Sequence, residues 1–500
     1  MQKVIPHFIN GKVLDYRNKT TPSIITNPAL GTPVGEVYFA EAGLIAEAIA
    51  AAKSAYATWS VLPVVKRARI LFKFKQLLEE NLQNLAEIIT VEHGKTLDDA
   101  KGEMLRGIEV VEFACGIAYL LKGAYTENVG TQVDSYSVRY PLGICVGFTP
   151  FNFPAMVPLW MFPLAIACGN CFILKPSEKV PTLAVRLAEL FCKAGLPAGV
   201  LQVIHGDKSV VDVLLESPEV QAVSFVGSTP VAKYVYATAA KFGKRVQALG
   251  GAKNHCVVMP DADLESVINS IKGAAFGAAG QRCMSLSVVV AVGEYTADQL
   301  VARLIEALND IRIGNGTKDD VDMGPIQNAA HRDNIIKVLE NGIAAGAKLV
   351  VDGREFSITK KGKGFFLGPS LFDHVTTDMD LYKQEIFGPV LCLVRVHDLD
   401  SAINIINEHA YGNGAAIYTQ SGYAARKFSS TVQAGMVGVN VPIPVPMAFY
   451  SFGGWKNSMF GHANMYGSEG INFYTKLKTI TARWPEIDFE ATDFQMPVMN

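Results

Sequence analysis

The chain has 500 residues, of which 45 are basic and 47 acidic, so the formal net charge is −2. Apolar residues make up 49% of the sequence. That fraction excludes intrinsic disorder as the main state, because disordered chains are poor in apolar side chains. The near-neutral charge argues against a nucleic-acid binder, which needs a basic face for the phosphates. Eight cysteines are too few for a disulfide scaffold and indicate reduced thiols in a cytoplasm. The length predicts about three domains.

One apolar window, Ala155–Leu174, is nearly long enough to cross a bilayer. Pro158 and Pro163 interrupt it, and the pair Gly169-Asn170 is typical of a turn. We therefore expect a buried helix followed by a buried strand, and no membrane partner. The N-terminal sequence MQKVIPHFINGK lacks the apolar stretch of a targeting segment.

After an opening of short strands and turns, the first elements expected are helices. Apolar residues at three-to-four spacing predict helices over Leu44–Trp59, Val64–Glu92 and Thr96–Leu121. The segment Gln132–Tyr140 alternates in polarity and predicts an exposed strand or hairpin. The alternating tail Ile471–Arg483 is expected to join it, and such a ribbon often pairs with another subunit.

From Gly143 onward, strands alternate with helices. The predicted strands are Cys145–Thr149, Cys171–Lys175, Val200–Ile204, Val220–Gly227 and Lys244–Leu249, and the helices between them are Pro154–Ala167, Pro181–Ala194, Val210–Glu216 and Pro230–Lys241. This alternation indicates a parallel sheet covered by helices on both faces. A second alternation comprises the helices Leu264–Ala278 and Thr296–Asn309 and the strands Leu286–Val292, Lys348–Val351 and Val390–Val396. The predicted fold class is therefore α/β, with a separate second α/β domain.

The usual dinucleotide fingerprint G-x-G-x-x-G is missing, but two strand ends offer other places for a dinucleotide. After Gly227, either Ser228 or Thr229 can cap the next helix and leave its first amides free for a phosphate. Lys175 and Glu178 follow another strand, where the glutamate suits a free ribose 2′-hydroxyl and would repel a 2′-phosphate. The residues alone leave open an ordinary strand–turn–helix at the first place and a solvated charge pair at the second.

Among the cysteines, Cys283 is the candidate nucleophile. It follows a run of small residues and adjoins Arg282, a cation that would favour the reactive thiolate. Cys168 and Cys171 form a C-x-x-C without a second pair or a nearby His, so we expect both to be buried. Asn152 lies just beyond a predicted strand, where its amide can donate to an oxyanion. The residues alone leave a core role for Cys283 and a helix-capping role for Asn152 as alternatives.

Five motifs occur in a fixed order along the chain. They are PFNFP at Pro150–Pro154, KPSE at Lys175–Glu178, FVGS at Phe225–Ser228, GQRC at Gly280–Cys283 and EIFGP at Glu385–Pro389. In this order and spacing the chain resembles the aldehyde dehydrogenase superfamily over almost its whole length. The resemblance implies an aldehyde dehydrogenase-like α/β fold with two parallel-sheet domains. It places an NAD-binding domain over residues 1–124 and 144–251, a catalytic domain over 252–450 and an oligomerisation ribbon over 125–143 and 470–486. It also implies a homotetramer, a dimer of dimers.

The resemblance further implies roles for the site residues. Cys283 would be the nucleophile, and Asn152 with the Cys283 amide would form the oxyanion hole. The expected cofactor is NAD, and no metal is needed. The implied cofactor-binding residues are Phe151, Lys175, Glu178, Gly227, Ser228, Glu385 and Phe387.

One departure from the family pattern indicates a subtype. Most members have Glu-Leu-Gly-Gly ahead of the catalytic cysteine, and that glutamate activates the deacylating water, but this chain has Ala248 at the same place. Loss of a general base typically costs about 10²–10⁴-fold in rate. A thioester on Cys283 would then wait for coenzyme A, because a thiol needs less activation than water.

The sequences around these motifs are similar to the CoA-acylating branch that oxidises methylmalonate and malonate semialdehyde and releases CO₂ with propionyl-CoA or acetyl-CoA. By that resemblance, Arg106 and Arg282 would clamp the substrate carboxylate, which suits the planar guanidinium. A solvated position is the alternative for Arg106. Two other functions stay open: a hydrolytic aldehyde dehydrogenase with Glu178 or Glu385 as base, and a non-catalytic dinucleotide-binding protein.

Overall fold

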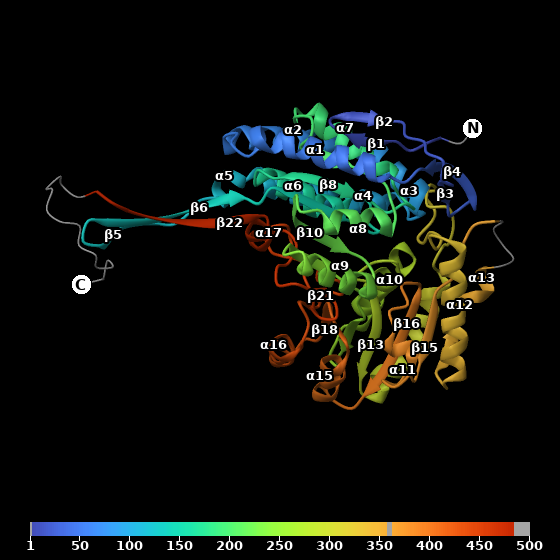
Figure 1. Cartoon of the computed structure of the whole chain (residues 1–500). Coiled ribbons are helices and arrows are strands. Elements are labelled where there is room, and N and C mark those ends of the chain that lie inside the picture. The colour runs from blue at the N-terminus through green and yellow to red at the C-terminus, as the bar shows by residue number, and fades with distance from the viewer. Residues whose placement is uncertain (1–2, 358–362, 485–500) are drawn as a thin grey trace.

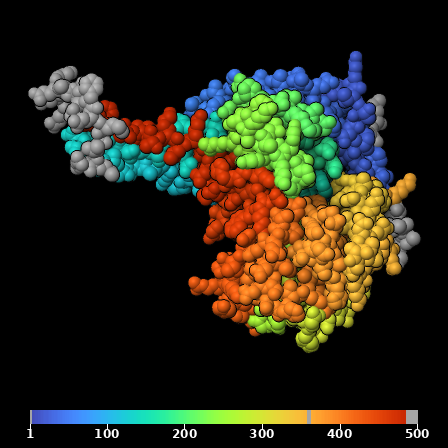
Figure 2. All heavy atoms as spheres, turned by 60° about the horizontal axis from the view of Figure 1, so that its bottom comes forward, coloured from blue at the N-terminus to red at the C-terminus, as the bar shows by residue number. Residues whose placement is uncertain are grey.

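The computed structural model describes residues 3–357 and 363–484. Two helix-covered sheets form the upper and lower bodies of the molecule, and a thin arm projects from the upper one (Figure 1). Figure 2 shows from another side that the arm leaves the body without folding back onto it. The observed architecture is the α/β fold with two largely parallel sheets that the sequence predicts.

The upper sheet has eight strands in the order β2-β1-β9-β8-β7-β10-β11-β21. Its strands are β1 His7–Ile9, β2 Lys12–Leu14, β7 Ile144–Phe148, β8 Cys171–Lys175, β9 Leu201–Val203, β10 Val220–Val226, β11 Arg245–Leu249 and β21 Met459–Phe460. The five central strands are parallel, and antiparallel strands close both edges. Because the chain runs outward from β7 in one direction and then returns to β10, the strand order reverses between these two strands. Ligands of open α/β sheets bind at the carboxyl ends of strands at such a reversal.

The helices that cover the upper sheet include the apolar window noted above. They are α1 Ala42–Trp59, α2 Val64–Glu80, α3 Leu82–His93, α4 Leu97–Cys115, α5 Ile117–Leu120, α6 Met156–Ala167, α7 Thr182–Lys193, α8 Lys208–Glu216 and α9 Thr229–Lys241, with the hairpin β3 Ser23–Asn27 and β4 Thr32–Val37 beside them. All twelve residues of α6 are buried, and β8 after it is fully buried too, which confirms the predicted helix and strand. Across residues 3–357 and 363–484, no helix is long and apolar enough to cross a membrane.

Two of the predicted helices are wrong in length, because each is divided into two shorter helices. The segment 64–92 divides at Asn81, whose side-chain amide donates to the Leu77 carbonyl and ends α2. The segment 96–121 divides at Gly116, where α4 ends. Helical periodicity continues across both breaks, so it gave no sign of either.

The lower sheet has seven strands in the order β14-β15-β16-β13-β12-β18-β19. They are β12 Asn254–Val258, β13 Leu286–Val292, β14 Lys348–Val351, β15 Ser370–Asp373, β16 Val390–Val396, β18 Gly414–Tyr418 and β19 Met436–Val439. The accompanying elements are α10 Leu264–Phe276, α11 Glu294–Asn309, α12 Ala329–Ala344, α13 Arg354–Ser357, α14 Asp380–Lys383, α15 Leu399–Glu408, α16 Gly422–Thr431 and the short pair β17 Tyr411–Gly412 and β20 Trp455–Lys456. The sheet has its own buried core, separate from that of the upper sheet.

The arm is a three-stranded antiparallel ribbon in the order β22-β6-β5, namely Thr475–Arg483, Val133–Pro141 and Tyr125–Gly130. Thr475 pairs with Pro141 and Arg483 with Val133, which confirms that the tail joins the predicted hairpin. Residues 471–473, predicted as part of this strand, instead end the helix α17 Gly467–Phe473. Residues 485–486, which the predicted ribbon includes, lie outside the described residues.

Candidate active site

A cavity of about 520 Å³ opens at the carboxyl ends of β7 and β10, where the strand order reverses. Its lining includes Phe148, Thr149, Lys175, Glu178, Phe225 and Pro230. The Thr149 hydroxyl is buried at its wall and has no hydrogen-bond partner in the described structure. An unpartnered buried hydroxyl usually has an external partner. This cavity therefore has the place and the chemistry for a bound nucleotide.

Lys175 and Glu178, at the end of β8, both face this cavity. The Lys175 ammonium donates to the Gly206 carbonyl over 2.8 Å and lies 3.8 Å from a Glu178 carboxylate oxygen. Burial lowers the pKa of Lys175, and Glu178 opposes that shift. The two side chains are thus partly buried and held by hydrogen bonding and charge, which argues against the alternative of a solvated charge pair.

The turn from β10 into α9 carries the second candidate for nucleotide contact. Gly227 donates its amide to the Leu249 carbonyl, and Ser228 occupies the N-cap of α9 without a side-chain capping bond. Pro230 and Val231 in the first helical turn line the cavity. The first amides of α9 therefore lack the intrahelical partners that helix N-termini leave to an external acceptor.

The loop before Cys283 has an unusual backbone. α10 ends at Phe276, not at Ala278 as predicted, because Ala278 and Ala279 adopt left-handed conformations with φ of 51° and 53°. At Gly280, with φ of 69°, an added Cβ would lie 2.1 Å from the Gly388 carbonyl oxygen. Glycine is required there because no side chain fits so close to a backbone carbonyl.

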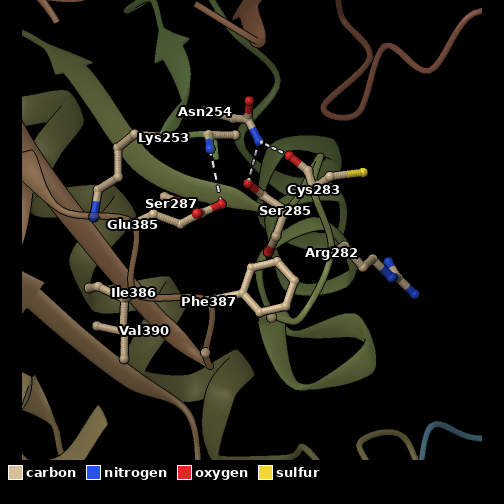
Figure 3. Close-up of a pocket in the computed structure, with 13 residues that line it drawn as sticks. Lys253, Asn254, Arg282, Cys283, Ser285, Ser287, Glu385, Ile386, Phe387 and Val390 are labelled. Atoms are coloured by element: carbon tan, nitrogen blue, oxygen red, sulfur yellow. Dashed lines mark hydrogen bonds between the residues drawn. The ribbon is translucent and has the colours of Figure 1, made fainter. Parts of the chain in front are cut away.

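Two asparagine amides hold Cys283 in place. Asn254 Nδ2 donates to the Cys283 carbonyl over 3.0 Å and to the Ser285 carbonyl over 2.9 Å, while the Cys283 sulfur points away from Asn254 (Figure 3). Asn413 Nδ2 donates to the same Cys283 carbonyl over 3.1 Å. Cys283 is partly exposed, whereas six of the eight cysteines are buried. Cys283 is therefore not fully buried, which argues against the purely core role that the residues alone left open.

Cys283 lies between two cavities. The first has about 260 Å³ and also contains Arg106, Arg282, Phe153 and Phe452 in its wall. The second is small and includes Asn254, Glu385 and Phe387, as Figure 3 shows. The thiol thus borders one cavity that contains Arg106 and another that contains the Glu385 carboxylate and the Phe387 ring, and Arg282 lines both cavities.

The prediction that Arg282 favours the Cys283 thiolate is wrong. Burial raises the pKa of Cys283 to about 12, the Glu385 carboxylate raises it further, and the Lys95 ammonium acts in the opposite direction. Arg282 instead donates to Asp99 over 2.6 Å. Arg282 and Cys283 are neighbours in the sequence, but their side chains point to different surroundings.

Asn152 is buried beside the Cys283 loop. Its Nδ2 donates to the Gln281 carbonyl over 3.1 Å, and the second amide hydrogen has no partner within residues 3–357 and 363–484. α6 begins at Met156, with Ala155 in the N-cap position, so Asn152 does not cap that helix. The capping alternative is therefore wrong.

Aromatic rings from the two bodies meet next to the small cavity. The rings of Phe151 and Phe387 lie edge to face with centroids 5.9 Å apart. Phe387 has a φ of 56°, and His331 Nε2 lies 2.8 Å from its carbonyl oxygen. Glu385 accepts a hydrogen bond from the Ala252 amide over 2.9 Å, and burial raises its pKa to about 7.

Cys168 and Cys171 are both buried, as predicted. Burial raises the pKa of each thiol to about 12. No disulfide joins them, since all eight cysteines are free. Among the described residues there is no group of three or more His, Cys, Asp or Glu that could hold a metal.

One face of α4 supplies the predicted Arg106 together with two residues that we did not single out in the sequence, Asp99 and Glu103. Asp99, Glu103 and Arg106 recur at intervals of four and three and all line the 260 Å³ cavity. This spacing places side chains on one helix face. The pattern was available in the sequence, but a charged helix face is more often solvated than buried.

The family model "Aldehyde dehydrogenase family" matches residues 16–480. The chain belongs to the aldehyde dehydrogenase family. It is 53% identical to a malonate-semialdehyde dehydrogenase of Pseudomonas aeruginosa, covering 98% of this chain and 99% of the relative. It is 52% identical to malonate-semialdehyde dehydrogenase 1 of Geobacillus thermodenitrificans, covering 96% and 99%.

Two solved structures of family members are also similar. The methylmalonate-semialdehyde dehydrogenase of Oceanimonas doudoroffii superposes with a TM-score of 0.95 at 49% identity, covering 97% of this chain and 99% of that one. A Sinorhizobium meliloti protein assigned the same activity and solved with NAD superposes with a TM-score of 0.95 at 52% identity, with the same coverage.

Within this aldehyde dehydrogenase, Ala248 lies in β11 and is fully buried. It pairs with Phe225 of β10 and with Phe460 of β21. Its methyl group cannot accept a proton. The place where most family members are expected to have a catalytic glutamate is thus an apolar position in the upper core.

Proposed function

We propose that the chain oxidises malonate semialdehyde and methylmalonate semialdehyde with NAD⁺, releases CO₂ and transfers the acyl group to coenzyme A. The products are acetyl-CoA and propionyl-CoA. The relatives at 49–53% identity are named for these two semialdehydes, which supports this substrate class. Cys283 is the nucleophile, and its thioester is the intermediate.

The single observation that carries the proposal is the shared cavity of Cys283, Arg106 and Arg282. Both substrates have a carboxylate two carbons from the aldehyde carbon, so an aldehyde at the sulfur needs a cation a short distance away. Arginine suits this task because its fork of donors matches a carboxylate. Arg106 is already held by the Pro446 carbonyl over 2.6 Å and by Glu109, which orients its guanidinium.

The cavity at β7 and β10 fits the adenosine and phosphates of NAD. Lys175 and Glu178 would hold the adenosine ribose, and Gly227 and Ser228 would place the first amides of α9 near a phosphate. The unpartnered Thr149 hydroxyl in the same cavity supports this assignment. When bound, NAD⁺ supplies the hydride acceptor.

On the nicotinamide side, Glu385, Phe151 and Phe387 would contact the ribose and ring. Glu385 and Phe387 line the small cavity that reaches Cys283, whereas Arg106 lines only the 260 Å³ cavity and Arg282 lines both. The edge-to-face contact of Phe151 and Phe387 fixes both rings at this point.

The residues of the chain then act in order. The Cys283 sulfur attacks the aldehyde carbon, and the free hydrogen of the Asn152 amide, with the Cys283 amide, stabilises the resulting oxyanion. After loss of hydride the acyl group remains on sulfur. The β-carboxylate leaves as CO₂, because the thioester carbonyl can delocalise the electron pair left behind, and the enolate takes a proton.

Acyl transfer to a thiol follows from the absence of a base at Ala248. Glu178 lies in the nucleotide cavity away from Cys283, and Glu385 is engaged with the Ala252 amide. Neither position favours activation of a water molecule at the thioester, so the hydrolytic alternative is not supported. Coenzyme A is the better acceptor because its thiol ionises far more readily than water.

We also propose that residues 1–124 and 144–251 act as the NAD-binding domain and residues 252–450 as the catalytic domain. The ribbon of 125–143 and 470–486 would join subunits into a homotetramer. Exposed apolar side chains on the ribbon, namely Tyr125, Tyr136, Tyr140 and Leu477, support a subunit contact there. A cytoplasmic location agrees with eight free cysteines.

A steady-state assay with malonate semialdehyde and NAD⁺ tests the proposal. With coenzyme A we expect continuous NADH formation and acetyl-CoA as product, and without it a single burst of NADH per active site. Continuous turnover without coenzyme A, with a free acid as product, would contradict it. Cys283→Ala is the control, and it should bind NAD⁺ without forming NADH.

A further inference from the structure

The segment that carries Asn152 rests on a fully buried ion pair. The ammonium of Lys95 lies 2.8 Å from a carboxylate oxygen of Glu103, and neither side chain has any exposed surface. Lys95 follows Gly94, where α3 ends in a left-handed turn, and Glu103 belongs to α4. Removing both charges from water is costly, so such a pair persists where further hydrogen bonds satisfy it.

Lys95 makes its other contacts with the oxyanion segment. Its ammonium donates to the Asn152 carbonyl over 2.7 Å and lies 4.3 Å from the centroid of the Phe153 ring. With the bond to Glu103 the ammonium makes two hydrogen bonds, and the Phe153 ring adds a cation–π contact. The backbone of Asn152 is thus tied to a charge that cannot move into solvent.

Glu103 holds the same segment from its other end. One carboxylate oxygen accepts the amides of Ala155 over 2.7 Å and Met156 over 3.1 Å, at the first turn of α6. The other oxygen accepts from Lys95. The turn between β7 and α6 is therefore clamped at both ends by one ion pair.

We propose that Lys95 and Glu103 are positioning residues for the reaction, which together hold the Asn152 amide in the geometry that stabilises the oxyanion and set the electrostatic field at Cys283. This inference rests on the proposed function, since it assigns the pair to thioester formation at Cys283. Asn152 is held from two sides, because its side chain donates to the Gln281 carbonyl while its own carbonyl accepts from Lys95.

The field at the sulfur gives the pair a second effect. Lys95 is the cation that opposes the rise in the pKa of Cys283, and Glu385 is the carboxylate that adds to it. The other charged groups of the adjoining cavity are already paired, Arg282 with Asp99 and Arg106 with Glu109. Removal of the positive charge of Lys95 should therefore raise the pKa of Cys283, and removal of the negative charge of Glu103 should lower it.

The test uses the full-length protein with the variants Lys95→Met and Glu103→Gln. The first readout is the rate of the NADH burst with malonate semialdehyde in the absence of coenzyme A. Loss of one oxyanion donor typically costs about 10²–10³-fold, and we expect Lys95→Met to slow the burst by about 10²-fold. Glu103→Gln should slow it less, because the amide oxygen can still accept from α6.

The second readout is the rate of iodoacetamide alkylation of Cys283 at one fixed pH below the pKa of the thiol, followed on its peptide by mass spectrometry. We expect the alkylation rate to fall in Lys95→Met and to rise in Glu103→Gln, while NAD⁺ affinity changes less than twofold. A merely structural loss would move both rates in the same direction. The matched control is Lys75→Met, which removes a surface ion pair with Glu79 on α2.

A burst within twofold of wild type in folded Lys95→Met, or alkylation rates that change in the same direction in both variants, would overturn the inference. If Lys95→Met does not fold, the alkylation rate of Glu103→Gln decides, and a rate equal to or below that of wild type overturns it. Both readouts precede acyl transfer, so they are independent of coenzyme A. A failure of the proposed function would show instead as continuous turnover of the wild type without coenzyme A.

Discussion

The guanidinium of Arg282 donates to Asp99 of α4 over 2.6 Å, although Arg282 directly precedes Cys283 in the chain. The contact joins the loop of Cys283, the proposed nucleophile, to the helix that also carries Glu103 and Arg106. Arg282 lies in the wall of the 260 Å³ cavity that Cys283 also lines, but its guanidinium is bonded to Asp99. It can meet a substrate carboxylate there, but it does not activate the thiol.

This arrangement predicts a specific loss in Arg282→Gln. A hydrogen bond to a charged group contributes about 1.5–3 kcal/mol, so the KM for malonate semialdehyde should rise by about 10- to 100-fold. The KM for propanal, which has no carboxylate, should stay within twofold of wild type. Steady-state kinetics with both aldehydes checks this, with Arg312→Gln, an exposed arginine paired with Asp322, as control. An equal rise for both aldehydes would contradict a carboxylate contact.

The ionisation of Cys283 predicts a pH dependence. Burial raises the pKa of the thiol to about 12, so below that pH the thiolate fraction increases about tenfold per pH unit. Alkylation by iodoacetamide without NAD⁺ should therefore increase through pH 10 without a plateau. Saturating NAD⁺ should shift the profile to lower pH, because its positive ring favours the thiolate. A plateau near pH 8 in the protein without NAD⁺ would contradict this prediction.

A base placed at position 248 should change the acyl acceptor. In Ala248→Glu, we expect turnover without coenzyme A to rise by about 10²-fold, because general-base help is typically worth about 10²–10⁴-fold. The melting temperature should fall, since Ala248 is fully buried and a carboxyl group there is costly. Ala248→Gln is the control of equal size without a base. If the folded glutamate variant is no faster than the glutamine variant, the argument from Ala248 fails.

Glu178 should set the choice between NAD⁺ and NADP⁺. Its carboxylate lies in the nucleotide cavity near Lys175 and would repel a 2′-phosphate. In Glu178→Gln, the ratio of kcat/KM for NADP⁺ to that for NAD⁺ should rise by about tenfold, because like charges in contact cost several kcal/mol. Glu189→Gln, on the exposed face of α7, serves as control. An unchanged ratio would place the ribose elsewhere.

The sequence by itself determined the alternation of strands and helices, the ribbon and the chemistry of the motif residues. Each of these depends on patterns a few residues long: apolar runs for β7 to β11, alternation for β6 and β22, and a thiol or an amide directly after a strand or tight turn. The order and spacing of the five motifs also indicated the family, because both can be read directly from a single sequence.

The tertiary structure alone decided which charges meet. Lys95 reaches Asn152 across 57 residues, and Arg282 reaches Asp99 across 183. No local pattern separates these side chains from solvated ones, because burial and pairing depend on how distant segments pack. The same holds for the left-handed Ala278 and Ala279, which directly precede the close approach of Gly280 to the Gly388 carbonyl. The sequence supplied the reactive groups, and packing selected their partners.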